Sequence, residues 1–257
     1  MTKTYITMIS LQSRQGLLKT CYRPQGFALK KNRKTSFPII PVIAEDYREG
    51  DTVKILAVRA DNMDTPDNYM VFLEELADLG ISSDHVTEIP VAEAQGDAAG
   101  VGLLLRILDE IPEDSVIRAD ITFGTKPMSA ILLYAMNFVE KLKDAEVEGI
   151  YYGEILRRKG EQVEDGAILH DLTVFKLLGD TIDQMEAMKL EDPQKILHRM
   201  LERQAEAPYE QEKRREKNTS CSGTGRTVWG DPPGALPDAE GDKSAPGCPL
   251  EMVSYAS

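Results

Sequence analysis

The sequence predicts an α/β fold: a Rossmann-like parallel sheet with helices on both faces, followed by C-terminal helices and a disordered tail. As far as about residue 153, short apolar segments of strand character alternate with amphipathic segments of helical period. Strands joined by helical crossovers pair in parallel with right-handed connections, so the alternation favours a sheet covered on both faces. The alternation then gives way to helical segments, and finally to a stretch rich in glycine and proline.

The first part of the chain contains two expected strands. Residues 5–11 are rich in β-forming side chains and end in the polar loop 12–16. Residues 37–43 are apolar, but their two prolines argue against a central strand. Residues 53–58 are predicted to form the second strand of the sheet.

The next segment carries the signals of a helix start. Thr65 is a candidate cap, Pro66 suits the first helical position, and Asp67 complements the positive end of the helix dipole. Gly80 marks the end of the helix. Between these limits, apolar residues recur at helical spacing: Tyr69, Phe72, Leu73, Leu76 and Leu79.

The same alternation continues through the middle of the chain. Residues 86–91 are predicted to form a third strand and residues 97–111 a second helix. Residues 115–121 follow as a fourth strand, and residues 127–143 as a third amphipathic helix with basic residues in its last turn. Residues 147–152 close the series as a fifth strand.

Three parts are predicted along the chain. Residues 1–156 form a ligand-binding domain, residues 157–217 a helical linker or dimerisation extension, and residues 218–257 a disordered tail. Helical patterns cover residues 172–190 and 193–217, and we expect the first of them to pack within the chain rather than on a partner. Eleven of the 40 residues of the tail are glycine or proline, a composition typical of disorder.

Composition excludes several classes of function. The formal net charge of −13 argues against a duplex-DNA binder, because such proteins usually carry a basic excess. Apolar runs are far shorter than the roughly 20 residues of a membrane span, and the start of the chain lacks the pattern of a signal peptide, so we expect a cytoplasmic protein. Three scattered cysteines without a CxxC pair predict neither a disulfide framework nor a zinc site. No metal or cofactor is expected.

The strongest candidate site is the predicted strand-to-helix loop 120–128. Ligands of open parallel sheets bind where strands end and helices begin. Gly124 allows close approach of the backbone to a ligand, Thr122 and Thr125 offer hydroxyl groups, and the free N–H groups of the helix start favour an anion. Lys126 opposes the positive end of the helix dipole, a conflict that an anionic ligand would remove. Because proline disfavours helical geometry in the preceding residue, we expect Lys126 to stay in the loop.

Other interpretations of this loop are weaker or plainer. The spacing of a P-loop is absent, since threonine precedes Lys126 instead of following it, and the dinucleotide fingerprint G-x-G-x-x-G is missing. The loop could also be an ordinary connection with a solvated lysine. Asp120 is interpreted as a capping or loop-bracing acid rather than a catalyst.

A second candidate loop follows the first predicted strand. Ser10, Gln12 and Ser13 offer two hydroxyl groups and an amide. If the first and fourth strands are neighbours, both loops open at the same edge of the sheet, and these side chains lie beside Lys126. Taken alone, a polar loop of this kind is more often solvent-facing than functional.

The run ADITFGTKPMSAILLYAMNFVEKLKDAEVEGIYYGEI resembles the signature half of the CARF domain (CRISPR-associated Rossmann fold), the cyclic-oligoadenylate sensor of type III CRISPR systems. The resemblance covers about residues 1–190, with the best match at 120–154. It implies a homodimer of Rossmann-like domains that binds a ring of adenylates across its two-fold axis in antiviral defence. The loop residues that it implies as ligand contacts are Gly124, Thr125 and Lys126 together with Ser10, Gln12 and Ser13. Phe123 departs from the glycine or histidine of many relatives.

Two functions remain open from the sequence. Many CARF proteins carry a HEPN ribonuclease with an Arg-x-x-x-x-His motif, but His170 and His198 lack an arginine five residues upstream. The favoured function is a sensor of cyclic oligoadenylate, with cyclic tetra-adenylate preferred. The alternative is a metal-independent ring nuclease, in which a ribose 2′-hydroxyl attacks the adjacent phosphate, Lys126 stabilises the phosphorane and Ser10 orients the 2′-oxygen. No general base is evident for that reaction.

A third possibility is a nucleotide-responsive regulator outside CRISPR, although no helix-turn-helix pattern supports a transcription factor.

Overall fold

The computed structural model describes residues 1–92, 96–158, 161–190, 192–199 and 201. Its contacts divide the chain into two units, Met1–Pro193 and Gln194–Ser257. The first unit contains every element discussed below. Residues 193–199 of the predicted second helical stretch are helical. Most of the rest of that stretch, and the whole predicted tail 218–257, lie outside the described residues.

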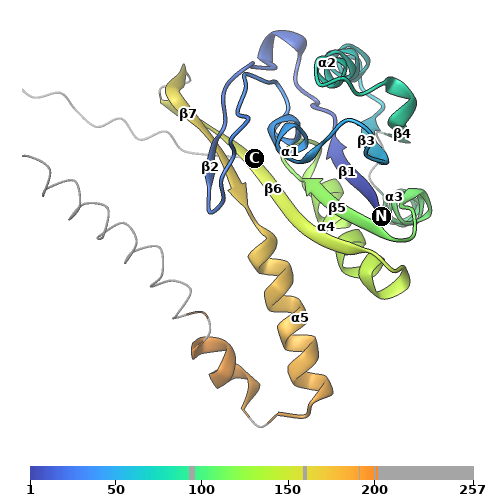
Figure 1. The fold of residues 1–257 in the computed structure, drawn as a ribbon, viewed down its shortest axis with the longest axis vertical. Coiled ribbons are helices and arrows are strands. Elements are labelled where there is room, and N and C mark those ends of the chain that lie inside the picture. Colours follow the sequence, from blue (N-terminus) through green and yellow to red (C-terminus); the bar gives the residue numbers. More distant parts are fainter. Residues whose placement is uncertain (93–95, 159–160, 191, 200, 202–257) are drawn as a thin grey trace, which may run out of the picture. The chain divides into compact units, whose positions relative to one another are not determined.

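The described residues form an α/β fold around one seven-stranded sheet, as the sequence predicts (Figure 1). The strand order is β2-β7-β6-β5-β1-β3-β4. All neighbouring strands are parallel except β6 and β7, which pair antiparallel. The strands are β1 (Thr2–Met8), β2 (Arg23–Gln25), β3 (Val53–Ala60), β4 (Val86–Val91), β5 (Ser115–Asp120), β6 (Glu146–Arg158) and β7 (Glu161–Asp171).

Helices cover both faces of the sheet. Helices α1 and α2 pack on one face, while α3 and α4 pack on the other. Short 3-10 turns, η1 (Arg14–Gly16) and η2 (Ser83–His85), lie in connections. The helices are α1 (Ile39–Asp46), α2 (Thr65–Ala77), α3 (Asp97–Glu110), α4 (Lys126–Leu142) and α5 (Thr173–Ala187). None of the described helices is long and apolar enough to cross a membrane.

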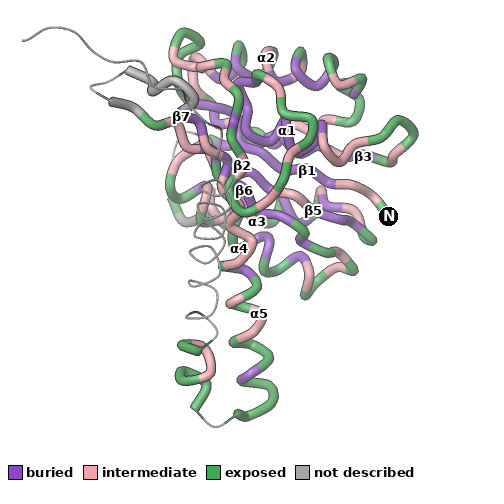
Figure 2. The backbone as a smooth tube through the Cα atoms, turned by 60° about the vertical axis from the view of Figure 1, so that its left-hand side comes forward, coloured by how far each residue is buried: buried purple, intermediate pink, exposed green. Residues whose placement is uncertain are grey.

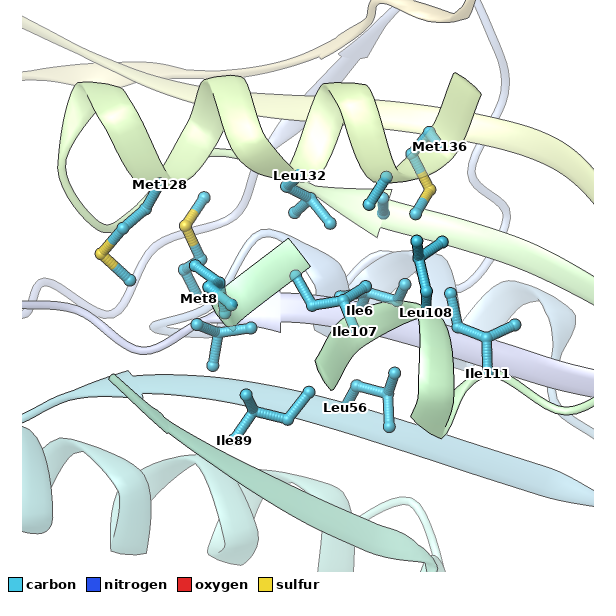
Figure 3. Packing of buried hydrophobic residues seen from close by; sticks show 14 of the residues in the cluster. Ile6, Met8, Leu56, Ile89, Ile107, Leu108, Ile111, Met128, Leu132 and Met136 are labelled. Carbon is cyan, nitrogen blue, oxygen red and sulfur yellow. The ribbon is translucent and has the colours of Figure 1, made fainter. Parts of the chain in front are cut away.

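The core on the α3–α4 side is built from aliphatic and methionine side chains (Figure 3). Met128, Leu132 and Met136 recur along α4 at helical spacing and are almost fully buried. They pack with α3 against alternate residues of the central strands, which Figure 2 shows as largely buried. The residues of α3 and of the sheet in this core cluster include Ile107, Leu108, Ile111, Ile6, Met8, Leu56 and Ile89.

The apolar run at residues 37–43 does not form a strand but the start of α1. Pro38 occupies the N-cap position, and Pro41 lies in the first turn, where backbone N–H groups have no intrahelical partner. Ile39, Ile40 and Ile43 are fully buried, and residues 39–44 form a continuous buried stretch before Glu45 and Asp46 end the helix. The prolines that argue against a strand are thus the signal of a helix start.

The predicted change from sheet domain to helical extension at residue 156 is wrong. Strand β6 continues to Arg158 and turns back into β7, so residues 157–171 belong to the sheet and not to a helical extension. Ala167 and Leu169 of β7 are fully buried on the α1 side, which gives this hairpin a place in the core. The expected helix at residues 172–190 is present as α5, and Lys176 Nζ contacts Glu140 of α4. Packing within the chain is limited, because Lys176 and Met185 are the buried residues of α5, whereas Leu177, Ile182 and Met188 are exposed.

Candidate anion-binding site

The two candidate loops meet at the carboxyl edge of the sheet. Strands β1 and β5 are direct neighbours, with Thr7 opposite Asp120, so the loops that follow them open side by side. Gly124 adopts a φ of +84°, and a Cβ built on it would lie 2.6 Å from the sulfur of Met8 in β1. The loop after β5 therefore lies close to the side chain of Met8 at the end of β1, and the positive φ favours glycine at this position.

Asp120 braces this loop from inside. Its carboxylate is fully buried and accepts hydrogen bonds from Thr7 Oγ1 (3.0 Å), from the backbone N–H of Thr122 (3.0 Å) and from Thr122 Oγ1. Burial raises the pKa of Asp120 to about 6, although the hydrogen bonds from Thr122 and Thr7 act in the opposite direction. The geometry matches a loop-bracing role for Asp120.

Thr122 is tied into the scaffold rather than free to contact a ligand. Its hydroxyl donates to Asp120 and accepts a hydrogen bond of 2.7 Å from the backbone N–H of Gly153 in β6. The single hydroxyl proton is therefore already used. Thr122 joins the loop after β5 to the β6–β7 hairpin.

Lys126 stands at the start of α4 as an unpaired cation. The helix begins at Lys126, one residue before the predicted start, and Pro127 occupies its second position. Lys126 is exposed and makes no hydrogen bond or ion pair with any residue that the structure describes. The N-cap residue Thr125 makes no side-chain cap, and its Oγ1 is buried without a partner in the described part of the chain. A helix start with a free lysine and uncapped N–H groups is suited to an anion.

The loop after β1 is held by a residue that sequence reasoning did not single out. Asn68 of α2 is fully buried, and its Nδ2 donates to the carbonyl groups of Ser10 (2.9 Å) and Gln12 (2.8 Å). Its Oδ1 is buried without a partner among the described residues. Asn68 lies one turn before the buried Phe72, so a polar residue on the apolar stripe of the helix was the available signal.

The predicted members of the β1 loop fall into two groups. Ser10 is fully buried, and its Oγ accepts a hydrogen bond of 3.2 Å from the backbone N–H of Gln12. This geometry makes Ser10 part of the turn, so a direct contact with a ligand requires the loop to rearrange. Gln12 and Ser13 are exposed at the same edge as Lys126.

A histidine–carboxylate pair lies on the β6–β7 hairpin beside the loop. His170 Nε2 is 2.9 Å from Glu154 Oε2, and the His170 ring stacks on Tyr152 at a centroid distance of 6.1 Å and an angle of 26°. These residues come from two strands that the sequence analysis did not pair, so the cluster was not predictable from spacing. Gly153, which lies between Tyr152 and Glu154, makes the hydrogen bond to Thr122.

An apolar groove of about 420 Å³ runs between α3 and α4, beginning beside Lys126. Pro127 and Met128 line the end of the groove at the start of α4. Further along α4, Tyr134 is 61% exposed and Phe138 41% exposed. Exposed apolar side chains thus continue from the candidate site along the outer side of these helices.

The described residues contain no group of three or more His, Cys, Asp or Glu side chains that could hold a metal ion. A scan against models of known protein families finds no match for the chain, and a search of curated proteins finds no relative. The candidate site therefore depends on its own geometry and on the motif resemblance.

Proposed function

We propose that this chain is a sensor of type III CRISPR antiviral defence that binds a cyclic oligoadenylate, with cyclic tetra-adenylate as the favoured ligand. The observation that carries the proposal is Lys126: an exposed cation without a partner in the described structure, at the uncapped start of α4. A positive side chain at the positive end of a helix is unfavourable until an anion joins it. The phosphodiester groups of the ligand supply that anion.

The neighbouring loops supply the remaining contacts. Gly124 lies beside Met8 at the end of β1, and the exposed Gln12 and Ser13 offer an amide and a hydroxyl at the same edge. Such groups hydrogen-bond ribose hydroxyl groups and the edge of adenine. Thr122 and Ser10 keep the two loops in shape.

The ligand-binding form is a homodimer in this proposal. A cyclic tetra-adenylate has two-fold symmetry and meets the same patch on both subunits of an isologous dimer. The exposed apolar face of α3 and α4 begins beside Lys126, and the proposed two-fold axis passes this end of the face, so that the two copies of Lys126 lie near one another. Two nearby lysines repel each other, and the anionic ring removes that repulsion.

Calorimetric titration of the purified protein with cyclic tetra-adenylate tests the proposal. We expect saturable binding, and at least a tenfold loss of affinity in Lys126→Ala, because one charge-assisted phosphate contact is lost from each subunit. Lys141→Ala is the matched control: it removes the same charge from the opposite end of α4, where Lys141 pairs with Asp183 at 2.5 Å. No heat with any cyclic adenylate, or equal affinities of the Lys126→Ala and wild-type proteins, would contradict the proposal.

One observation also favours ring cleavage as a second activity of the same site. The sequence offers no evident general base, whereas the structure holds His170 against Glu154 on the hairpin next to Thr122.

A further inference from the structure

We propose that His170 is the general base that opens the bound cyclic oligoadenylate, and that Glu154 positions its imidazole ring. This inference rests on the proposed ligand of the Lys126 site. It concerns a different step, because binding requires only the cation and the loops, whereas cleavage requires a group that removes a proton from a ribose 2′-hydroxyl.

The pair has the geometry of an oriented base. His170 Nε2 lies 2.9 Å from Glu154 Oε2, which favours the tautomer with its proton on Nε2. His170 Nδ1 makes no hydrogen bond to a described residue and is then the free acceptor nitrogen. The ring of Tyr152 stacks on the imidazole ring of His170 and limits its rotation. A base held by a carboxylate in this way is the arrangement that activates hydroxyl nucleophiles.

The pair faces the same side of the sheet as α4. Tyr151 belongs to the core on the α1 side, and a Cβ on Gly153 would meet Pro38 and Tyr22 on that side. Side chains alternate along a strand, so Tyr152 and Glu154 point to the α4 side, as does His170 opposite Tyr152. This part of the face is open: the Glu154 side chain is 40% exposed and the His170 side chain 25% exposed.

The pair also lies close to the ligand loop. Ile121 N donates to Tyr151 O at 2.9 Å, and Gly153 N donates to Thr122 Oγ1 at 2.7 Å. The loop therefore runs alongside β6 at the level of the pair. His170 stands on the next strand, roughly 10 Å from the line of β5, or two strand spacings. A ring of four nucleotides bound at the loop after β5 extends over two strand spacings.

The chemistry balances without a co-reactant. His170 Nδ1 accepts the proton of a ribose 2′-hydroxyl, and the 2′-oxygen forms a bond to the adjacent phosphorus. The bond from phosphorus to the 5′-oxygen breaks, and the 5′-oxygen takes a proton from solvent while the imidazolium returns its proton to solvent. The product is a linear adenylate with a 2′,3′-cyclic phosphate and a 5′-hydroxyl group. Lys126 stabilises the negative charge on the phosphoryl oxygens during the attack.

Single-turnover cleavage of radiolabelled cyclic tetra-adenylate by the full chain tests the inference, with affinity measured in parallel. We expect slow conversion to linear products by the wild-type protein. His170→Ala is expected to lower the rate at least 100-fold, the typical contribution of a general base, with less than a threefold change in affinity. Free imidazole in the buffer should restore part of the rate to His170→Ala. Glu154→Gln should lower the rate about tenfold, and free imidazole should not restore it.

The controls separate this inference from the proposed function. His85→Ala changes an exposed histidine in the turn before β4 and should leave the rate unchanged. If His170→Ala does not fold, the test uses His170→Gln instead, which keeps a polar group toward Glu154. Binding of an intact ring that the wild-type protein never cleaves, or wild-type rates in the His170 variants, overturns the inference and leaves the sensor proposal standing. Absence of binding overturns both.

Discussion

Asp120 places a carboxyl group at the buried end of the central strand, where it holds both Thr7 and Thr122. Burial disfavours the charged form, so the pKa of this group in the folded chain is about 6, above the ordinary value near 4. Between these two values the folded protein keeps the proton and the unfolded chain releases it. The loop that carries Lys126 is therefore braced by a group that titrates in mildly acidic solution.

The sign of the resulting pH dependence follows from linkage. A raised carboxyl pKa stabilises the fold fully below pH 4, and this contribution is lost as the pH rises to about 6, after which the dependence levels off. A shift of about two units corresponds to a loss on the order of 3 kcal/mol. We expect urea unfolding at a series of pH values to show this loss in the wild-type protein relative to Asp120→Asn, which has no carboxyl to titrate. If the free energies of unfolding of the two proteins changed in parallel with pH, the raised pKa of Asp120 would be contradicted.

Single residues differ in how far the sequence reveals them. Gly124 and Lys126 were predictable because a glycine and a cation between a strand and a proline-marked helix start carry a local meaning. The buried state of Ser10 was not, because it depends on Asn68 from a distant helix. The Glu154–His170 pair depends on a strand pairing across 16 residues, which no local pattern specifies.

The hairpin of β6 and β7 is the element that links the core to the candidate site. Gly153 lies at the point where β6 passes Pro38 on one side and the hydroxyl of Thr122 on the other. A Cβ at this position would lie 2.4 Å from Pro38 Cγ, and the proline ring has little freedom to move away. The close approach of the α1 start to the hairpin therefore requires glycine.

Gly153→Ala should accordingly destabilise the protein. We expect a loss of about 1–3 kcal/mol, typical of overpacking in a core, in chemical denaturation monitored by far-UV circular dichroism. Gly102→Ala on α3 is the matched control: a Cβ there meets nothing within 4 Å. Alanine in a helix interior is favoured over glycine by about 0.5–1 kcal/mol, so that variant should be slightly more stable. Equal effects of the two substitutions would show that Gly153 is not sterically required.

At the level of elements, the sequence predicted those with a clear period and missed those defined by context. The strands and helices from residue 53 to residue 152 follow the predicted alternation, because the apolar period is clear there. The predicted cap Thr65 is wrong: Asp64 holds the N-cap position of α2, and Thr65 is the first residue of the helix. Helix α1 was missed because residues 39–44 are all buried, so this stretch reads as one short continuous apolar run, which does not distinguish a helix from a strand. Strand β7 was missed because it is defined by its antiparallel pairing with β6, which no pattern within residues 161–171 reveals.

At the scale of the whole described structure, an apolar surface is exposed on the α3–α4 side. Tyr134 and Phe138 of α4 lie with ring centroids 6.3 Å apart on this surface. Continuous exposed apolar surface on a folded domain usually marks an interface. Val101 of α3 lines the same groove as Tyr134 and Phe138. Leu105 of α3 and Leu133 and Leu142 of α4 are also exposed.

A charge placed on this surface should separate the proposed dimer. Tyr134→Lys is expected to weaken self-association at least 100-fold in sedimentation velocity, because an aromatic anchor is lost and a cation is buried. Its circular dichroism should match that of the wild-type protein, since Tyr134 is 61% exposed. Met63→Lys, which changes a residue 95% exposed in the loop after β3, should not alter the sedimentation of the protein. A wild-type chain that sediments as a monomer with and without cyclic tetra-adenylate would contradict the dimer.

The two edge strands of the sheet affect how copies of this chain can associate. Each outermost strand contains a proline: Pro24 in β2 and Pro90 in β4. Proline has no N–H group to donate, so an incoming strand cannot form an unbroken ladder at either margin. Growth of open-ended fibres by strand addition is thereby disfavoured at these two strands. The proposed association through α3 and α4 does not use these strands and meets no such obstacle.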